Sequence, residues 1–232
     1  MSDVLDLAAR IDHTLLKAEA TAEQVDQICV EARQHGFAAV CVNPVYIRRA
    51  RQALAGSEVK ACAVIGFPLG ANTSLSKARE AADAIEQGAD ELDVVAHLPA
   101  LVAEEYAAIH GELVEVITAA QNARTDVVVK VIIESALLME GVPAAQAERR
   151  IATACRAIHD AGCDYVKSST GFHPAGSATE QAVRLMRSHA RSLKVKASGG
   201  IRTREQAVRM IAAGADRLGC SSSVAIVQSA QT

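Results

Sequence analysis

The sequence predicts a single (β/α)8 barrel, in which eight parallel strands alternate with helices. The chain has 232 residues, half of them apolar, which is enough for one closed core. A pattern of helix end, glycine and buried strand recurs in QHGFAAVCV (34–42), QGADELDVV (87–95), AGCDYVKSS (161–169) and AGADRLGCS (213–221). Because a helix commonly ends on a left-handed glycine, this repeat predicts alternating helices and parallel strands.

Eight segments are expected to contain the strands. Four are the repeated segments, and the others are TLL (14–16), KACAVIG (60–66), VVVKVIIE (127–134) and LKVKASG (193–199). Strands that are buried on both faces consist of nearly continuous apolar residues, as in parallel sheets. The spacing of the eight segments matches the unit length of a (β/α)8 barrel. An open doubly wound sheet has the same alternation, so it is the strand count that favours closure.

The segments between the strands have helical signals. TAEQVDQICVEARQ (21–34) begins with a Thr-x-x-Gln capping box, SLSKAREAADAIEQ (74–87) begins with serine, and REQAVRMIAAG (204–214) ends on glycine. We interpret these segments as amphipathic helices on the outside of the barrel. No stretch rich in proline, glycine and serine divides the chain, so residues 1–232 are expected to form one catalytic domain.

The composition argues against several classes of function. The formal net charge is −3, and the basic residues are scattered rather than interleaved with aromatics, unlike those of a nucleic-acid-binding surface. No segment approaches the roughly 20 uncharged apolar residues of a membrane span, so a cytoplasmic protein is expected. The six cysteines form no CxxC pair, which indicates reduced thiols rather than a structural zinc site.

Three predicted strands contain a lysine where an apolar residue is expected. They are Lys130 in VVVKVIIE, Lys167 in DYVKSST and Lys196 in KVKASGG. Burying an ammonium group costs several kcal/mol unless the group is paired or loses its charge. Lys167 and Lys196 both follow a valine, precede small residues and lie on consecutive predicted strands.

The strand spacing predicts that the amines of Lys167 and Lys196 lie close together. Adjacent parallel strands are about 4.8 Å apart, and barrel enzymes place their sites at the carboxyl-terminal mouth. Repulsion and desolvation lower the pKa of a lysine from its usual value of about 10.4, and a neutral amine attacks aldehydes to form a Schiff base. The simpler alternative is a structural ion pair with Asp93, Glu134 or another acid.

Asp93 is an acid inside a predicted strand. It lies between Leu92 and Val94 in ELDVV, where apolar residues are expected. It is therefore either a proton-transfer partner for a lysine or half of a buried salt bridge.

Two glycine-rich or serine-rich segments follow the last two predicted strands. They are SGGIRT (198–203) and GCSSS (219–223). Barrels often bind phosphate through backbone amides of the loops after strands seven and eight. We expect Gly171, after strand six, to complete such a site, and ordinary turns and caps are the alternative.

Eight segments together resemble one family over nearly the whole chain, the deoxyribose-phosphate aldolases, which are class I aldolases. The segments are IDHTLLK (11–17), VCVNP (40–44), VIGFPLG (64–70), ELDVV (91–95), KVIIE (130–134), YVKSSTGF (165–172), VKASGGIRT (195–203) and GADRLGCSSS (214–223). The resemblance implies a (β/α)8 barrel that reversibly cleaves 2-deoxy-D-ribose 5-phosphate to acetaldehyde and D-glyceraldehyde 3-phosphate. It also implies that no metal or organic cofactor takes part.

The resemblance further implies roles for particular residues. Lys167 is expected to form the Schiff base, and Lys196 to lower its pKa and, together with Asp93, to relay protons through water. The positions that match phosphate-binding residues are Gly171, Gly199, Gly200, Gly219, Ser221 and Ser222. The positions that match the sugar end of the pocket are Asp12, Thr14, Leu16, Cys41 and Thr170.

Several positions depart from the family pattern. After ELDVV many members have Asn-Ile-Gly where this chain has His-Leu-Pro (97–99), and His97 is interpreted as a polar substitute at the barrel rim. Ser168 stands where threonine is usual, and HPAGSAT (173–179) replaces a more glycine-rich loop. Some relatives have a C-terminal tyrosine that assists proton transfer, and VAIVQSAQT (224–232) contains none.

Two other functions are compatible with the pattern. A phosphosugar isomerase or epimerase would use Asp93 with a lysine or histidine as acid and base, and it does not require the paired Val-Lys motif. A non-catalytic phosphosugar-binding barrel would keep the glycine-rich loops and tolerate the loss of Lys167. The expected partners are a small phosphosugar and aldehydes, with no nucleic acid or membrane, and the resemblance favours a homodimer or homotetramer.

Overall fold

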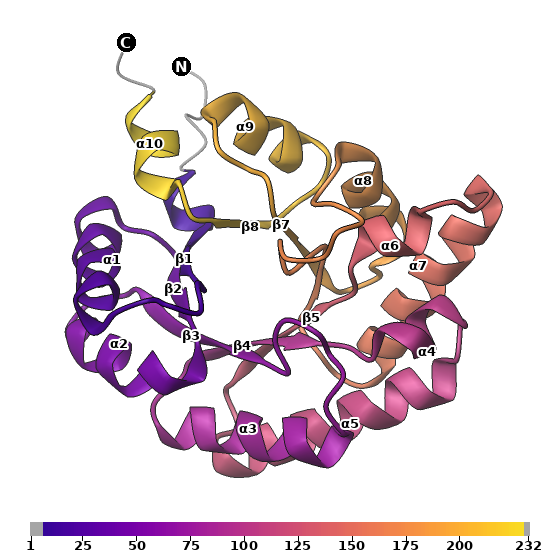
Figure 1. The fold of residues 1–232 in the computed structure, drawn as a ribbon, viewed down its shortest axis with the longest axis horizontal. Helices are drawn as coiled ribbons and strands as arrows, with labels where there is room; N and C mark the ends of the chain where they lie inside the picture. The colour runs from indigo at the N-terminus through magenta and orange to yellow at the C-terminus, as the bar shows by residue number, and fades with distance from the viewer. Residues whose placement is uncertain (1–6, 230–232) are drawn as a thin grey trace.

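Eight parallel strands close into a barrel in the order β1 to β8, with helices around the outside (Figure 1). The computed structural model describes residues 7–229. The two ends of the predicted domain, 1–6 and 230–232, lie outside the described residues, and so does the end of the segment 224–232. The prediction of a (β/α)8 barrel is confirmed, and the open doubly wound sheet is excluded.

Seven of the eight strands lie within the segments predicted for them. The strands are β1 (Ile11–Leu15), β2 (Ala39–Val42), β3 (Lys60–Ile65), β4 (Glu91–Val95), β5 (Val128–Ile132), β6 (Tyr165–Lys167), β7 (Lys194–Ser198) and β8 (Arg217–Cys220). The prediction for the first strand, 14–16, is wrong at its start. The strand begins at Ile11 because the polar side chains of Asp12 and His13 are buried against partners from distant parts of the chain.

Long helices alternate with the strands, as predicted. They are α1 (Ala22–His35), α3 (Ser74–Glu86), α5 (Tyr106–Ala123), α7 (Ala144–Asp160), α8 (Glu180–His189) and α9 (Arg204–Ala212). The shorter elements are η1 (Ala8–Arg10), η2 (Pro44–Tyr46), α2 (Ile47–Ala53), α4 (Leu98–Val102), α6 (Ser135–Met139) and α10 (Ser223–Gln228). The capping box predicted for the first helix is present, with Thr21 and Gln24 bonded reciprocally. Within residues 7–229, no helix is long and apolar enough to cross a membrane.

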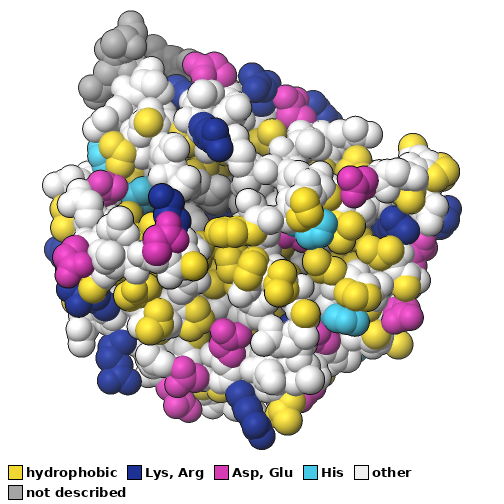
Figure 2. Space-filling view, viewed as in Figure 1, with side chains coloured by type: hydrophobic (Ala, Val, Ile, Leu, Met, Phe, Trp, Pro, Cys, Tyr) yellow, Lys and Arg dark blue, Asp and Glu magenta, His cyan; other side chains and the backbone are white. Residues whose placement is uncertain are grey.

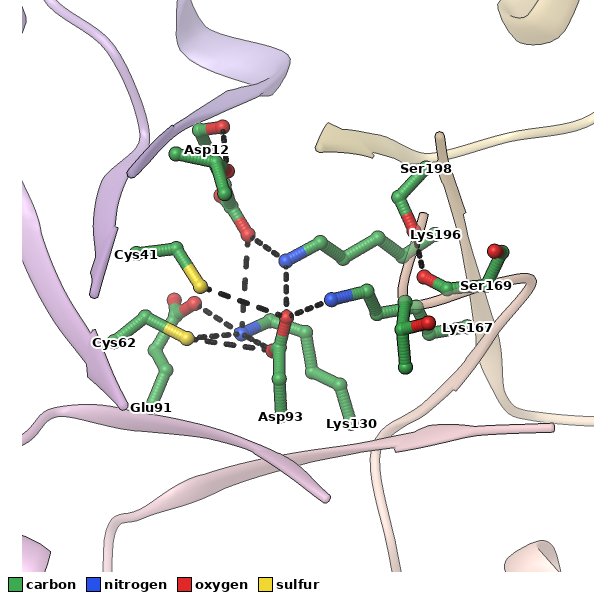
Figure 3. A network of polar contacts seen from close by, with 12 residues as sticks. Asp12, Cys41, Cys62, Glu91, Asp93, Lys130, Lys167, Ser169, Lys196 and Ser198 are labelled. Carbon is green, nitrogen blue, oxygen red and sulfur yellow. Dashed lines mark hydrogen bonds and ion pairs between the residues drawn. The ribbon is translucent and has the colours of Figure 1, made fainter. Parts of the chain in front are cut away.

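Alternation along each strand separates an apolar outer layer from a polar barrel interior. In β4, Leu92 and Val94 belong to the main hydrophobic core, between barrel and helices. Glu91 and Asp93, on the opposite face of the strand, point into the barrel (Figure 3). The fold therefore collects the inward-facing charges of different strands at one place.

Three exposed hydrophobic side chains lie in segments that follow the carboxyl ends of strands. Val45 follows β2, Leu69 follows β3 and Phe172 follows β6. The rings of Phe67 and Phe172 pack edge to face, with centroids 5.3 Å apart. In the view of Figure 2, hydrophobic side chains gather across the middle of the face. The carboxyl-terminal mouth thus has an apolar rim.

Candidate active site

Charged side chains from six strands meet inside the barrel. Figure 3 shows those from β1, β4, β5, β6 and β7. Three carboxylates and four cationic groups form the cluster, so the fully ionised cluster has one excess positive charge. All members are buried except the arginine, whose side chain is 16% exposed. The members are Asp12 on β1, Glu91 and Asp93 on β4, Lys130 on β5, Lys167 on β6, Lys196 on β7 and Arg217 on β8.

Asp93 lies at the centre of this charge cluster. Its Oδ2 accepts hydrogen bonds from Nζ of Lys167 and Nζ of Lys196, both at 2.6 Å. Its Oδ1 accepts from Nζ of Lys130 at 2.9 Å and from Sγ of Cys62 at 3.3 Å. Burial acts to raise the pKa of Asp93, but the three ammonium groups outweigh it and hold the pKa well below its usual value. Asp93 is therefore a carboxylate in this cluster.

The predicted lysine pair is brought together by strand register. Lys167 on β6 is the direct neighbour of Lys196 on β7, and both amines point to the same oxygen of Asp93. The sequence pattern predicts two facing amines, whereas the structure places a carboxylate between them. The ion pair with Asp93, which was the simpler alternative, is thus present in the structure, and it coexists with the close approach of the two lysines.

Lys196 has more acidic partners than Lys167. It pairs with Asp12 as well as with Asp93, whereas Lys167, among the residues that the structure describes, pairs with Asp93 alone. Burial acts to lower the pKa of Lys196, but the carboxylates of Asp12 and Asp93 outweigh burial and raise the pKa above its usual value. Lys196 is therefore a persistent cation beside Lys167.

The cluster also contains Lys130, Glu91 and Arg217, which lie on the side away from Lys167. No catalytic or binding role was predicted from the sequence for these three residues. Nζ of Lys130 lies 2.6 Å from Oε2 of Glu91, and Arg217 donates to Oδ1 of Asp12 at 2.7 Å. Burial opposes the charge on Lys130, but Asp93 and the other acidic groups raise its pKa well above the usual value. Glu91 and Arg217 could have been identified as candidates because each is a charged residue at the start of a strand-like segment, in ELDVV and DRLGC.

The five predicted residues of the sugar end separate into three groups. Leu16 and Cys41 belong to one small apolar cluster, against which Phe67 packs. Asp12 lies in the charge cluster, and Lys196 and Arg217 occupy its two carboxylate oxygens. Burial acts to raise the pKa of Asp12, but Lys196 and Arg217 outweigh it and hold the pKa below its usual value.

The side-chain hydroxyls of Thr14 and Thr170 form hydrogen bonds with nearby backbone groups. The hydroxyl of Thr14 donates to the carbonyl of Asp12 at 2.8 Å. The amide of Thr170 donates to Oε1 of Glu134 at 2.7 Å, and its hydroxyl accepts from the amide of Phe172. Glu134 therefore connects the loop after β6 to the end of β5. Its carboxylate binds this backbone amide instead of the strand lysine that the sequence offered as an alternative partner.

The thiols of Cys41 and Cys62 lie beside Asp93. They are direct neighbours in the register of β2 and β3, and their sulfur atoms and a carboxylate oxygen of Asp93 all lie within 4.8 Å of one another. A metal ion there would compete with three ammonium groups for the same carboxylate, so the charges around the position disfavour it. All six cysteines are buried and are present as free thiols.

The predicted phosphate loops after β6 and β7 lie against each other. Gly171, Gly199 and Gly200 have left-handed φ values of 80°, 89° and 74°. A Cβ atom on Gly199 would lie 3.3 Å from Cα of Gly171 and 3.0 Å from Ser177. The close approach of the two loops therefore requires a glycine at position 199, whereas a Cβ atom on Gly171 would lie at an ordinary contact distance of 3.6 Å from Gly199.

The third predicted loop follows β8 and continues the same rim. Gly219 is paired in register with Ser198, and a Cβ atom on it would lie 2.9 Å from Cβ of Ser198 and 3.3 Å from Cε of Lys196. The glycine thus makes room for the Lys196 side chain. Ser221 is exposed and Ser222 is half-buried at the end of this loop. Five of the six predicted phosphate positions therefore lie on three neighbouring loops, and Gly219 lies in β8 just before the third.

The departures from the family pattern have structural counterparts. Ser168 links the ends of β6 and β7, since its hydroxyl donates to the carbonyl of Ser198 at 3.2 Å and accepts from the amide of Ser198 at 3.0 Å. His97 is exposed after β4, in agreement with a rim position, and its backbone amide donates to Glu112. Neither residue belongs to the charge cluster.

A buried pair of lysines around one carboxylate, at the mouth of a (β/α)8 barrel, is typical of an aldolase that works through a Schiff base. The model of the DeoC/LacD family aldolases matches residues 7–229. The chain belongs to this family.

Named relatives agree with this assignment. The chain is 46% identical over 222 residues to the deoxyribose-phosphate aldolase of Brevibacillus brevis, with 96% of this chain and 95% of the relative covered. It is 48% identical over 223 residues to the deoxyribose-phosphate aldolase of Carboxydothermus hydrogenoformans, with 96% and 94% covered.

Solved structures are similar along the whole length. A putative deoxyribose-phosphate aldolase from Coccidioides immitis superposes with a TM-score of 0.90 at 40% identity, covering 100% of this chain and 88% of the other. The deoxyribose phosphate aldolase from Aeropyrum pernix, described as a tetramer, superposes with a TM-score of 0.86 at 36% identity, covering 97% and 91%.

Proposed function

We propose that the protein is a class I aldolase that reversibly cleaves 2-deoxy-D-ribose 5-phosphate to acetaldehyde and D-glyceraldehyde 3-phosphate, with Lys167 as the Schiff-base residue. The observation that carries the proposal is the shared carboxylate oxygen of Asp93, which holds Lys167 and Lys196 together inside the barrel. The membership of the aldolase family and the names of its relatives support the choice of substrate.

The charge balance of the cluster favours Lys167 as the nucleophile. The cluster has one more cationic group than carboxylates, so the release of one proton balances it. Arginine does not deprotonate in proteins, and the pKa values of Lys130 and Lys196 are raised above the usual lysine value. Among the described residues Lys167 forms an ion pair with one acid, Asp93, so it is the lysine of the cluster with the fewest carboxylate partners.

The proposed reaction begins when the neutral amine of Lys167 attacks the aldehyde carbon of the open-chain sugar. Loss of water from the carbinolamine gives an iminium, which is the electron sink for cleavage of the C2–C3 bond. The C3 hydroxyl loses its proton as glyceraldehyde 3-phosphate departs, and the resulting enamine gains a proton at C2. Hydrolysis consumes the water lost earlier and releases acetaldehyde, so no cofactor is required.

Asp93 and Lys196 are proposed to move protons in these steps. Both lie within hydrogen-bond distance of one another and next to Lys167, which is the geometry that general acid–base catalysis requires. Asp12 is proposed to act through Lys196, because both of its carboxylate oxygens are engaged by cations. Asp12 would then hold Lys196 in place rather than bind a sugar hydroxyl.

The remaining predicted residues are proposed to bind the two ends of the substrate. Leu16 and Cys41 would form an apolar wall that keeps water from the imine, and Thr14 and Thr170 would contact sugar hydroxyls. The phosphate would be bound by backbone amides and hydroxyls of the three rim loops. The residues proposed for the phosphate are Gly171, Gly199, Gly200, Gly219, Ser221 and Ser222.

An acetaldehyde-release assay with 2-deoxyribose 5-phosphate tests the proposal. Lys167→Met is expected to lower kcat at least about a thousandfold, because the covalent intermediate is lost. Lys194→Met is the matched control, since Lys194 is an exposed lysine on the neighbouring strand β7, and its activity is expected to be unchanged. Conversion of the sugar to an isomer without acetaldehyde would favour the isomerase, and binding without turnover would favour the non-catalytic barrel.

We also propose that the protein is a cytoplasmic homodimer or homotetramer. The tetramer described for the Aeropyrum pernix aldolase supports an oligomer for a chain of this fold. Light scattering coupled to size-exclusion chromatography gives the mass of the assembly directly. A monomer at micromolar concentration would contradict the proposal, and cell fractionation tests the location.

A further inference from the structure

His13 is a buried polar residue to which the proposed reaction gives no role. It lies on β1 next to Asp12, and successive residues of a strand face opposite sides. Asp12 points into the barrel, so His13 points outward, towards the helices that lie against β1, which are α1 and α10 (Figure 1). Only 3% of His13 is exposed.

Each ring nitrogen of His13 has a partner from a distant part of the chain. Nε2 lies 2.7 Å from a carboxylate oxygen of Glu31 on α1. Nδ1 lies 3.0 Å from the hydroxyl of Ser223, the first residue of α10. The Ser223 hydroxyl also donates to the carbonyl of Cys220, at the end of β8, at 3.0 Å. The ring of Phe37 packs against the imidazole with centroids 5.2 Å apart.

The partners of the two ring nitrogens belong to different helices. The Ser223 hydroxyl donates to the carbonyl of Cys220, and its oxygen also lies within hydrogen-bond distance of Nδ1. Burial acts to raise the pKa of Glu31, but hydrogen bonds from Gln27 and His13 hold it below its usual value, so the Glu31 carboxylate accepts from Nε2. The ring therefore ties both α1 and the start of α10 to β1.

This tie anchors the segment that follows β8. The segment runs from Cys220 to Ser223, and the Ser223 hydroxyl joins its two ends. The residues between them are Ser221, which is exposed, and Ser222, which is half-buried, so packing in the core holds neither firmly. The bond from Nδ1 connects the segment to β1, the strand that also carries Asp12 of the charge cluster.

We propose that His13 is a positioning residue that holds the segment 220–223 in place for the substrate phosphate, and thereby sets the preference for a phosphorylated over a non-phosphorylated sugar. The inference rests on the proposed function, in which Ser221 and Ser222 bind the phosphate. Donors that are held in position before binding give affinity because less ordering is needed when the phosphate arrives.

Two substitutions separate the two hydrogen bonds of His13. Asparagine places an amide near the position of Nδ1 and retains a donor to Ser223, whereas glutamine reaches the position of Nε2 and retains only the bond to Glu31. KM and kcat are measured for His13→Asn and His13→Gln with 2-deoxyribose 5-phosphate and with 2-deoxyribose. Thermal unfolding of each variant shows that it is folded.

His13→Gln is expected to raise KM for the phosphorylated sugar about tenfold, which corresponds to the loss of one hydrogen bond. Its kcat/KM for 2-deoxyribose is expected to change about twofold or less. His13→Asn is expected to restore KM for the phosphorylated sugar to within about twofold of the original value. Ser223→Ala removes the same bond from the other side, so combining it with His13→Gln is expected to raise KM no further.

Either of two results would overturn the inference. One is an unchanged KM for the phosphorylated sugar in both His13→Gln and Ser223→Ala. The other is an equal loss of kcat/KM on both sugars, which a purely structural role predicts. If His13→Gln does not fold, Ser223→Ala decides by the same comparison. Failure of the proposed function is distinct, because the unsubstituted protein would then release no acetaldehyde from either sugar.

Discussion

Asp93 accepts hydrogen bonds from three buried ammonium groups, and this single residue links the stability of the barrel interior to its chemistry. An isolated buried ammonium group is strongly unfavourable, so each lysine depends on a carboxylate for its place in the barrel. Lys130 and Lys196 have a second acidic partner, whereas Lys167 pairs within residues 7–229 with Asp93 alone. The proposed nucleophile is thus the lysine of the cluster that is held least firmly by charge.

Replacement of Asp93 by asparagine is expected to lower both activity and stability. We expect kcat for acetaldehyde release to fall about 10²- to 10⁴-fold, because the proton-transfer partner of Lys167 is lost. The free energy of unfolding, measured with urea, should fall by about 3–5 kcal/mol, because buried ammonium groups lose their shared partner. Asp126→Asn is the control, since the Asp126 side chain is 80% exposed, and should change stability by about 0.5 kcal/mol or less. Equal effects of the two substitutions would contradict this role of Asp93.

Replacement of Gly219 by alanine is expected to displace Lys196. The added Cβ atom would lie 2.9 Å from Cβ of Ser198 and 3.3 Å from Cε of Lys196. Overpacking of this kind costs about 1–3 kcal/mol, and we expect kcat to fall about tenfold as Lys196 moves relative to Asp93. Gly111→Ala on α5 is the control, since nothing lies within 4 Å of its added atom, and it should leave kcat unchanged. Full activity in Gly219→Ala would show that Lys196 tolerates the shift.

Residue by residue, the candidate site was predictable where a charge interrupts an apolar segment. Lys167, Lys196 and Asp93 stand out in this way, and strand spacing correctly places the two lysines side by side. The contact between Arg217 and Glu91, at 3.6 Å, was not predictable, because it crosses the barrel between β8 and β4. A local pattern contains no information about which inward-facing charges meet there.

At the scale of elements, β1 shows why a strand can escape detection. The apolar pattern is interrupted by Asp12 and His13, so the sequence predicts a start at residue 14, whereas the strand starts at Ile11. The partners of Asp12 are Lys196 and Arg217, and one partner of His13 is Ser223. These contacts compensate for the burial of two polar side chains, and they form only when the barrel closes.

The helices α3 and α5 are joined by a buried ion pair that also holds the end of β4. Nζ of Lys77 donates to Oε2 of Glu112 and to the carbonyl of Val95, both at 2.8 Å, and Oε1 of Glu112 accepts from the amide of His97. Lys77 is fully buried and Glu112 is nearly so. The two helices therefore position the strand that carries Asp93.

Lys77→Met is expected to lower the free energy of unfolding by about 3–5 kcal/mol, because it leaves the Glu112 carboxylate buried without its cation. The double variant Lys77→Met with Glu112→Gln should be less destabilised than the single variant, since the uncompensated charge is then removed while a hydrogen-bonding amide remains. Urea unfolding of the single and double variants measures the difference. A double variant that is at least as unstable as the single one would show that charge is not the cause.

On the scale of the whole molecule, closure of the barrel is what creates the site. The repeated helix, glycine and strand pattern predicts four strands within the correct segments, and apolar segments predict three more, because both are local signals. The short helices α4 and α6 were not predicted, since they pack at the mouth and have only five residues each. The interior charge network was not predictable either, because it depends on the order and tilt of all strands together.

The charge cluster predicts how the stability of the whole protein depends on pH. The pKa values of Asp12 and Asp93 are held below the value of about 3.9 of an unfolded chain, so their stabilisation is present above about pH 4 and is lost as the pH falls further. The pKa values of Lys130 and Lys196 are raised, so their stabilisation is present below the unfolded value of about 10.4 and is lost as the pH rises beyond it.

The free energy of unfolding should therefore have a plateau from about pH 5 to about pH 9 and fall on both sides of it. Urea unfolding at a series of pH values measures this profile. Asp93→Asn is expected to have a shallower acid limb than the original protein, because one depressed carboxylate is absent. Identical acid limbs for the two proteins would contradict the depressed pKa of Asp93.

Lys167 is proposed to form a covalent imine with the substrate, and reduction with borohydride would trap this imine. The protein is incubated with 2-deoxyribose 5-phosphate and sodium borohydride, and the intact mass and the modified peptide are determined by mass spectrometry. We expect one reduced adduct per chain, located on Lys167 and absent from a folded Lys167→Leu variant. No added mass, or the same adduct in Lys167→Leu, would contradict it.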